Sequence, residues 1–363
     1  MGCGKIADAH VEEIQKLQTA SLVSVCDLEP IMAEQLAVRY GIPAQYSDFD
    51  RMLAEQRLDV LHITTPPQSH VALVRKSMDA GCHVYLEKPV ALTYEQTCLI
   101  TEIAERANLK LTVNYWPNFD PPGAILHSLA AAGALGDIIH VESYLGYDLT
   151  GAFGQAILAD SNHWVHRLPG KLFHNNLDHI LNKIVPFLPD LDTDVRAIAF
   201  RRRNLAGSPT DLMMDELRIM LRSGTVSAYA SFSSHARPVG HFVRVYGTKK
   251  TVHADFNLRT VVFDGEQIFP SAIGRLMPPF QQGLRYIRQG ARNIRAFGAS
   301  RFHFFRGMTE LISAFYHAIE KDAVPPIPYS EIRRTSFLMD EVIRQIQPDD
   351  RPVSPQVLAG SSA

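Results

Sequence analysis

Residues 1–27, "MGCGKIADAHVEEIQKLQTASLVSVCD", decide the fold that we expect for this chain. Gly2, Gly4 and Ala7 have the spacing G-x-G-x-x-G/A, which in dinucleotide-binding folds follows a buried strand and opens the first helix. The next residues, "DAHVEEIQKLQ", have helical spacing, and "SLVSVCD" is typical of a short buried parallel strand. The stretch therefore predicts a glycine turn, a helix and a strand that ends at Asp27.

The same alternation continues along the chain. Helix-like and strand-like stretches follow in the order 31–41, 59–67, 69–81, 82–89, 93–107 and 110–115. Strands that alternate with helices predict parallel βαβ units, here a Rossmann-like doubly wound sheet. No strand comes before the glycine turn. We expect Met1 to stand where such a sheet has the last apolar residue of its first strand, with a short strand encoded upstream.

From residue 119 onward the pattern changes to longer strand-like stretches joined by turns such as "RSGT" and "YGTKK". Successive hairpins predict a largely antiparallel open sheet in an α+β domain. Prolines near 117–122 interrupt regular structure. We therefore predict an α/β protein with a dinucleotide-binding domain over 1–118 and a second domain, of α+β type, over 119–363.

The composition narrows the class of protein. The chain has 363 residues, 46% of them hydrophobic, and a formal net charge of −2, so nothing global argues for nucleic acid. Its four cysteines lack C-x-x-C spacing, which favours reduced thiols over a disulfide framework or a zinc site. No apolar run approaches the roughly 18 residues of a membrane span. We expect a cytoplasmic protein without a metal.

The glycine turn and Asp27 together predict a dinucleotide site. The turn glycines let the backbone approach a pyrophosphate, and the N-terminus of the helix adds N–H groups and its dipole. This assigns Gly2, Gly4, Lys5 and Ile6 to the cofactor. The carboxylate of Asp27 can accept the ribose hydroxyls and would repel a 2′-phosphate, so NAD is favoured over NADP. The alternative for Asp27 is the N-cap of the following helix.

Two further loops stand at predicted strand ends, "TTPPQSH" (64–70) and "EKP" (87–89), where ligands bind in open α/β sheets. "GCGKIADAH", "DVLHITTPPQSHVAL", "GCHVYLEKPVAL" and "GALGDIIHVES" resemble the Gfo/Idh/MocA (glucose-fructose oxidoreductase/inositol dehydrogenase) family. The resemblance implies an NAD(P)-dependent oxidoreductase. Its C-terminal domain, here 119–363, would be the substrate-binding and oligomerisation domain, whose open sheet often pairs subunits. It implies that Lys88 touches nicotinamide and substrate, and that the cofactor site includes Thr64, Thr65, Pro66, His70 and Glu87.

Oxidation of an alcohol requires a group that takes its proton. In "PGKLFHNNLDHILNKI" (169–184), Asn175, His179 and Asn182 lie opposite an apolar helix face, toward either solvent or a cleft. Relatives in the family resembled carry Asp and His here. Asn175 replaces the Asp, and an amide cannot stabilise imidazolium as a carboxylate does, so His179 should be a weaker base. We assign Lys88, His179 and Asn175 to catalysis, and Trp164, His166 and Asn182 to the substrate. Two alternatives remain open: Trp164 and His166 belong to a surface loop, and His174 with Asp178 forms a local i,i+4 pair.

A basic amphipathic insert spans about 270–306. Seven arginines and no acid lie between Glu266 and Glu310, and Leu284, Ile287, Ala291 and Ile294 form one stripe beside four of the arginines. Such a helix over 275–306 suits an anionic membrane surface or a phosphate-bearing ligand. Alternatively it is a solvated basic face that covers the protein's own core.

Three functions remain open from the sequence. The first is an NAD(P)-dependent oxidoreductase, a homo-oligomer, that acts on a sugar or a nucleotide- or lipid-linked sugar; the sugar rests on the resemblance. The second is a dinucleotide-binding sensor or assembly protein with impaired catalysis, suggested by Asn175. The third is a lyase or glycosidase that uses NAD without net redox change.

Overall fold

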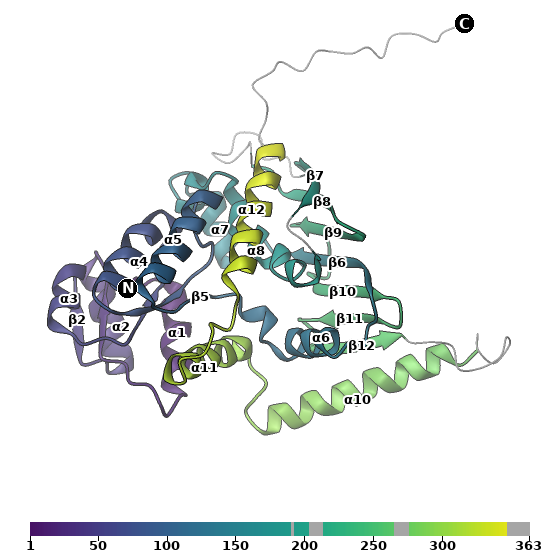
Figure 1. The fold of residues 1–363 in the computed structure, drawn as a ribbon, viewed down its shortest axis with the longest axis horizontal. Coiled ribbons are helices and arrows are strands. Elements are labelled where there is room, and N and C mark those ends of the chain that lie inside the picture. The colour runs from purple at the N-terminus through teal and green to yellow at the C-terminus, as the bar shows by residue number, and fades with distance from the viewer. Residues whose placement is uncertain (190–191, 203–212, 265–275, 347–363) are drawn as a thin grey trace, which may run out of the picture.

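The computed structural model describes residues 1–189, 192–202, 213–264 and 276–346. Its first part holds five parallel strands in two pieces: β1 (Ser24–Cys26) pairs with β2 (Ala44–Tyr46), and β4 (His83–Leu86) lies between β3 (Val60–Ile63) and β5 (Leu111–Val113). The helices between them are α1 (Lys5–Gln15), α2 (Pro30–Tyr40), α3 (Phe49–Glu55), α4 (His70–Asp79) and α5 (Tyr94–Ala107). Strands and helices alternate as the sequence predicted, except that β2 and α3 lie between α2 and β3, where no element was predicted (Figure 1). Both are short, three and seven residues, so neither has a clear periodic pattern.

Met1 and Gly2 lie between the two pieces of the parallel sheet. The Gly2 N–H donates to the carbonyl of Cys26 (2.8 Å), and the Met1 carbonyl accepts from the N–H of Thr64 (2.9 Å). Gly2 has a φ of +94°, and a Cβ there would lie 2.8 Å from Cγ2 of Thr65. Glycine is therefore required at this position, both by the backbone conformation and by the close approach to the loop after β3.

The second part holds a seven-stranded sheet in the order β12-β11-β10-β6-β9-β8-β7. The strands are β6 (Ile138–Gly146), β7 (Thr193–Phe200), β8 (Glu216–Ser223), β9 (Val226–Ser233), β10 (His241–Gly247), β11 (Thr251–Asp255) and β12 (Thr260–Asp264). All pairs are antiparallel except β6 with β9, which is parallel. The predicted largely antiparallel sheet is confirmed.

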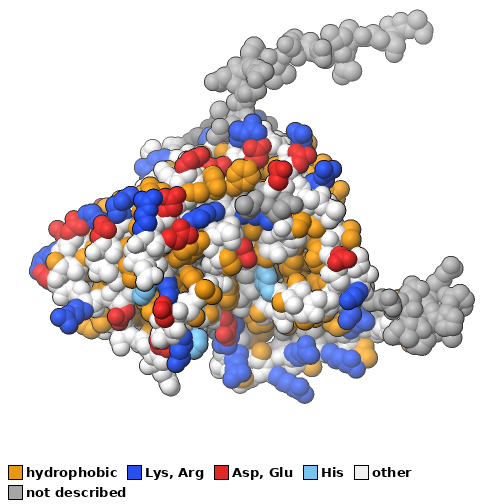
Figure 2. Space-filling model, viewed as in Figure 1, with side chains coloured by type: hydrophobic (Ala, Val, Ile, Leu, Met, Phe, Trp, Pro, Cys, Tyr) orange, Lys and Arg blue, Asp and Glu red, His pale blue; other side chains and the backbone are white. Residues whose placement is uncertain are grey.

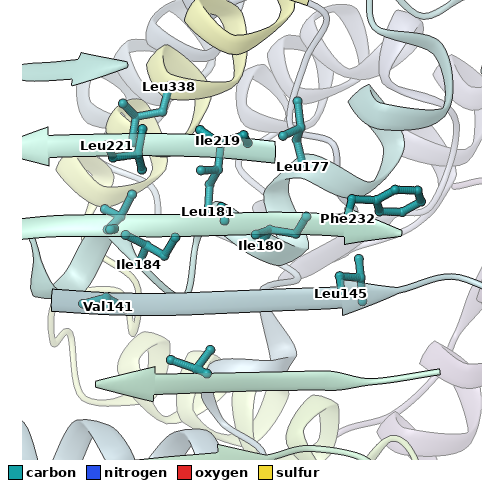
Figure 3. Packing of buried hydrophobic residues seen from close by; sticks show 14 of the residues in the cluster. Val141, Leu145, Leu177, Ile180, Leu181, Ile184, Ile219, Leu221, Phe232 and Leu338 are labelled. Carbon is teal, nitrogen blue, oxygen red and sulfur yellow. The ribbon is translucent and has the colours of Figure 1, made fainter. Parts of the chain in front are cut away.

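Two helices cover one face of this sheet, α8 (Lys171–Leu181) and α12 (Tyr329–Ile346). In Figure 3, side chains from α8 and Leu338 of α12 pack against side chains of the strands. Leu177, Ile180, Leu181 and Ile184, the apolar face predicted from the sequence, are all fully buried. This packing sets the orientation of α8, so its polar residues are held in place by the core. Two further helices, α6 (Pro121–Ala131) and α7 (Ala152–Ala159), precede and follow β6.

The C-terminal part of the chain returns to the first sheet. Helix α11 (Arg306–Glu320), which the sequence analysis did not predict, buries Met308, Leu311, Ile312 and Phe315 in the core of the parallel sheet. The ring of Phe315 lies 6.0 Å from that of Tyr85 in β4. The long helix α10 (Pro278–Gly298) precedes α11 and lies along the edge of the second sheet (Figure 1). All four cysteines are free thiols, as predicted.

Candidate functional site

The glycine turn leaves room where a cofactor would approach. Gly4 precedes the first residue of α1 and makes no side-chain cap, and a Cβ added there would meet no atom within 4 Å. The first N–H groups of a helix have no partner inside the helix and attract anions. Lys5 is exposed and Ile6 is half-buried in this first turn. The turn thus has the open backbone surface that a pyrophosphate requires.

Asp27 ties the end of β1 to the glycine turn. Its carboxylate accepts from the N–H of Cys3 (2.7 Å) and from the N–H of Glu29 (2.9 Å). The residue that caps α2 is Glu29, so the N-cap alternative for Asp27 is wrong. Each carboxylate oxygen can accept more than one hydrogen bond, so Asp27 can still receive hydroxyl groups beside the turn.

The loop after β3 lies against the glycine turn. The Thr64 hydroxyl donates to the Gly2 carbonyl (2.6 Å), and the hydroxyls of Thr65 and Ser69 share a hydrogen bond (2.7 Å). His70 is fully buried, and its two ring nitrogens face the carbonyls of Thr65 (2.8 Å) and Val90 (2.9 Å). His70 therefore joins this loop to the segment after β4, and Thr64 to Pro66 form the surface beside the turn.

Glu87 belongs to a buried network below the turn. Its carboxylate lies 2.8 Å from Nε2 of His10 and accepts from the amide of Asn114 (2.5 Å) and the N–H of Lys88 (3.0 Å). Burial acts to raise the pKa of Glu87, but the partners hold it below its usual value, His10 foremost among them. Glu87 thus contacts His10 of α1 and the backbone N–H of Lys88, and so connects α1 to the segment that carries Lys88.

Lys88 connects the two parts of the molecule. It follows β4, and its Nζ donates to the backbone carbonyl of Asn175 in α8 (3.1 Å), with the side-chain oxygen of Asn175 at 3.4 Å. Asn175 is 6% exposed, so the polar face of α8 looks into the protein. Lys88 and Asn175, assigned to one site from the sequence, do lie together.

His179 lies one helical turn beyond Asn175 and is half-buried. Its backbone N–H donates to Oδ1 of Asp178 (2.7 Å). Burial holds the pKa of His179 well below its ordinary value, and the positive charges of Lys88 and Lys183 lower it further. The imidazole is therefore neutral at neutral pH, which is the state that can accept a proton.

Three polar residues near His179 were not assigned to the site from the sequence: Lys183, His241 and Asp178, the last of which was expected only as a partner of His174. Nζ of Lys183, Oδ2 of Asp178 and Nε2 of His241 are buried and have no hydrogen-bond partner. Burial raises the pKa of Asp178 to about 6 and lowers that of Lys183 to about 7. Lys183 is four residues after His179, a spacing that places two side chains on the same helix face, so the sequence pattern contained a signal for it.

The three residues that the sequence analysis assigned to the substrate are held by contacts within the protein. Asn182 is 3% exposed, neither atom of its side-chain amide has a partner, and its carbonyl accepts from Asn118 (3.2 Å). Nε2 of His166, in η3 (Trp164–Arg167), lies 2.7 Å from the carbonyl of Ile157 in α7. Trp164 packs against the core of the second domain.

The expected pair of His174 with Asp178 does not form. Nε2 of His174 lies 3.1 Å from the carbonyl of Ala91, and Asp178 accepts from the N–H of His179. His174 therefore joins α8 to the segment after β4, and its Nδ1 and Oδ2 of Asp178 are left without a hydrogen-bond partner in the described part of the chain. Within the described ranges, no group of three or more His, Cys, Asp or Glu side chains could hold a metal ion.

Residues 1–115 match the family model of the oxidoreductase family with an NAD-binding Rossmann fold. D-glucoside 3-dehydrogenase of Escherichia coli is 30% identical over 139 residues, which are 38% of this chain and 40% of that protein. Inositol 2-dehydrogenase of Rhizobium meliloti is 28% identical over 138 residues, 38% of this chain and 41% of that protein. The chain thus matches about two-fifths of the length of these curated relatives.

The whole fold has a solved counterpart. The WlbA dehydrogenase of Bordetella pertussis, solved in complex with NADH and UDP-GlcNAcA, superimposes with a TM-score of 0.73 at 18% identity. The likeness covers 95% of this chain and 93% of that one. The arrangement of the parallel and the largely antiparallel sheets is therefore that of a solved dehydrogenase structure.

Proposed function

We propose that this chain, whose residues 1–115 belong to the Gfo/Idh/MocA oxidoreductase family, is an NAD-dependent dehydrogenase of a sugar-like CH–OH group. One observation carries the proposal: Nζ of Lys88, at the end of β4, meets Asn175 of α8 at 3.1–3.4 Å, on the helix that also bears His179. The ammonium of Lys88 thus lies close enough to the imidazole of His179 for its charge to lower the pKa of that imidazole. The resemblance and the relatives support the sugar-like substrate.

The residues present fit NAD. The groups that would hold it are the open space at Gly4, the N-terminus of α1, the carboxylate of Asp27 and the Thr64–Pro66 loop. Asp27 and the loop follow the ends of β1 and β3, and both contact the glycine turn. NAD, when bound at these residues, would supply the hydride acceptor for the oxidation of the alcohol carbon. Lys88 would donate to the substrate oxygen in place of Asn175, and His179 would take the hydroxyl proton.

The experiment is the NADH absorbance of the purified chain with NAD and a panel of polyols, free sugars, sugar acids and nucleotide-linked sugars. Turnover of any member supports a dehydrogenase, and Lys88→Met should abolish it. NAD binding without turnover of any member would favour the sensor. Product formed without a change in NADH would favour the lyase or glycosidase.

Asp27 should decide between NAD and NADP. Asp27→Ala removes a charged acceptor beside the turn, so we expect NAD to bind roughly 10- to 100-fold more weakly, as for the loss of a hydrogen bond to a charged group. Asp27→Asn keeps an acceptor and removes the charge, so it should improve the NADP-to-NAD ratio. Calorimetric titration of both cofactors measures this. If Asp27→Ala binds NAD as tightly as the unaltered chain, the carboxylate does not bind NAD and only accepts hydrogen bonds within the turn.

We also propose that the outer face of the second sheet pairs two copies of the chain. Ile198, Phe200, Met220 and Tyr229, from three adjacent strands, expose 41–68% of their surface there. Exposed apolar patches of this kind mark protein interfaces. The family resembled often pairs its subunits through this sheet, which supports the proposal of a homo-oligomer.

A further inference from the structure

Helix α10 is attached to the second sheet by polar side chains. The amides of Gln289 and Asn293 donate to the carbonyls of Val261 and Leu258, each at 3.0 Å. Arg285 donates to the carbonyl of Phe263, and its guanidinium lies 5.1 Å from the centre of the Phe263 ring. The side of α10 that faces the protein is therefore its polar side.

The apolar side of α10 faces away from the protein. At 3.6 residues per turn, five side chains fall within an arc of about 80° on the side opposite Gln289. This apolar stripe consists of Phe280, Leu284, Ile287, Ala291 and Ile294. Phe280, Ile287 and Ile294 expose 67–74% of their surface, and no residue of α10 is buried. The alternative that α10 covers the protein's own core is thus wrong.

Positive charge borders the stripe on one flank. Arg288, Arg292 and Arg295 occupy the adjoining arc of the helix and are exposed. No acidic residue occurs in the sequence between Glu266 and Glu310. Figure 2 shows basic side chains gathered along the lower right edge of the molecule, where Figure 1 places α10. Arg275 and residues 270–274 of the predicted insert lie outside the described residues.

We propose that the apolar stripe of α10 docks onto an anionic lipid surface. A helix with an exposed apolar face and flanking arginines lies in a bilayer interface, with its apolar side chains among the acyl chains and its cations at the lipid phosphates. Among the described residues, no helix is long and apolar enough to cross a bilayer, so the contact is interfacial. The attachment is independent of the proposed activity.

Charge favours a membrane over a second copy of the same helix. Two apolar stripes packed face to face in an antiparallel pair would bring two rows of arginines to the same side, with no acid on either helix, and like charges repel at this range. An anionic bilayer provides both an apolar layer and a negative surface. Its binding should therefore weaken with rising salt, because exposed charges are screened.

The test is sedimentation of the full chain with vesicles of phosphatidylcholine alone or mixed with phosphatidylglycerol. We expect binding to the mixed vesicles only. Arg288→Gln with Arg292→Gln should weaken it about 30-fold, at about 1 kcal/mol per basic residue near the surface. Ile287→Ser with Ile294→Ser should abolish it. The matched control, Arg57→Gln with Arg75→Gln, removes the same charge from exposed positions in the first domain and should bind as before.

Equal binding to both vesicle types, or equal loss in the control, would overturn the proposal. So would an assembly of the unaltered chain that Ile287→Ser with Ile294→Ser dissociates while no vesicle is bound, because a second copy would then cover the stripe. Circular dichroism of each variant shows that the fold is kept. Turnover of soluble substrate, measured on the same variants, reports the proposed activity separately, since no residue of α10 is assigned to that site.

Discussion

Replacing His179 with alanine should lower kcat about 10²- to 10⁴-fold, the usual contribution of a positioned general base. The imidazole that we propose as the proton acceptor belongs to α8, one turn beyond the residue that Lys88 contacts. Affinity for NADH should stay unchanged, because the glycine turn and Asp27 lie in the other domain. Steady-state kinetics together with a calorimetric NADH titration separates the two effects.

The matched control for this substitution is His317→Ala, an exposed histidine on α11. His317→Ala should change neither kcat nor the affinity for NADH. Turnover by His179→Ala at the rate of the unaltered chain would remove this residue from the mechanism.

The pH profile gives a second test of His179. Its pKa is held well below the usual 6.5, so the base stays deprotonated into the mildly acidic range. The acidic limb of kcat/KM should therefore lie below pH 6.5. Asn175→Asp would add a carboxylate nearby, which favours imidazolium, so it should move that limb to higher pH.

Replacing Lys183 with methionine should stabilise the protein at neutral pH. The buried ammonium has no hydrogen-bond partner, and burial lowers its pKa from 10.5 to about 7. At 1.36 kcal/mol per pKa unit, the charged form costs on the order of 4 kcal/mol at pH 7. Methionine has a similar length and carries no charge. Urea unfolding should therefore show a gain of a few kcal/mol, with Lys249→Met, an exposed lysine, as the control.

The gain should depend on pH in one direction. Between pH 7 and 10.5 the unfolded chain binds the lysine proton and the folded chain does not, so the unaltered protein becomes more stable as the pH rises. The advantage of Lys183→Met should therefore be full below pH 7 and vanish toward pH 10.5. A loss of stability in Lys183→Met that is equal at both ends of this range would mean that the ammonium is well paired in the folded state.

Local patterns were sufficient where neighbours in sequence are also neighbours in space. The glycine turn, the alternation of strands and helices and the apolar face of α8 each depend on spacings of a few residues, and the structure has all three, with β2 and α3 added to the predicted alternation. The placing of Lys88 beside Asn175 came from the family resemblance, since 87 residues separate them in the chain. His174 shows the limit of local patterns, because the carbonyl of Ala91, 83 residues away, takes its ring nitrogen in place of Asp178.

By itself, the sequence determined the fold class, the glycine turn at Gly2 and Gly4, and the amphipathic character of α10, since each depends on local spacing. Only the tertiary structure decided which side of α10 faces the protein, because a helical pattern has two faces and no intrinsic partner for either. It also decided that Asp178, Lys183 and His241 are buried beside His179. Burial depends on which elements pack together, and that packing sets the charge of the groups that we assign to catalysis.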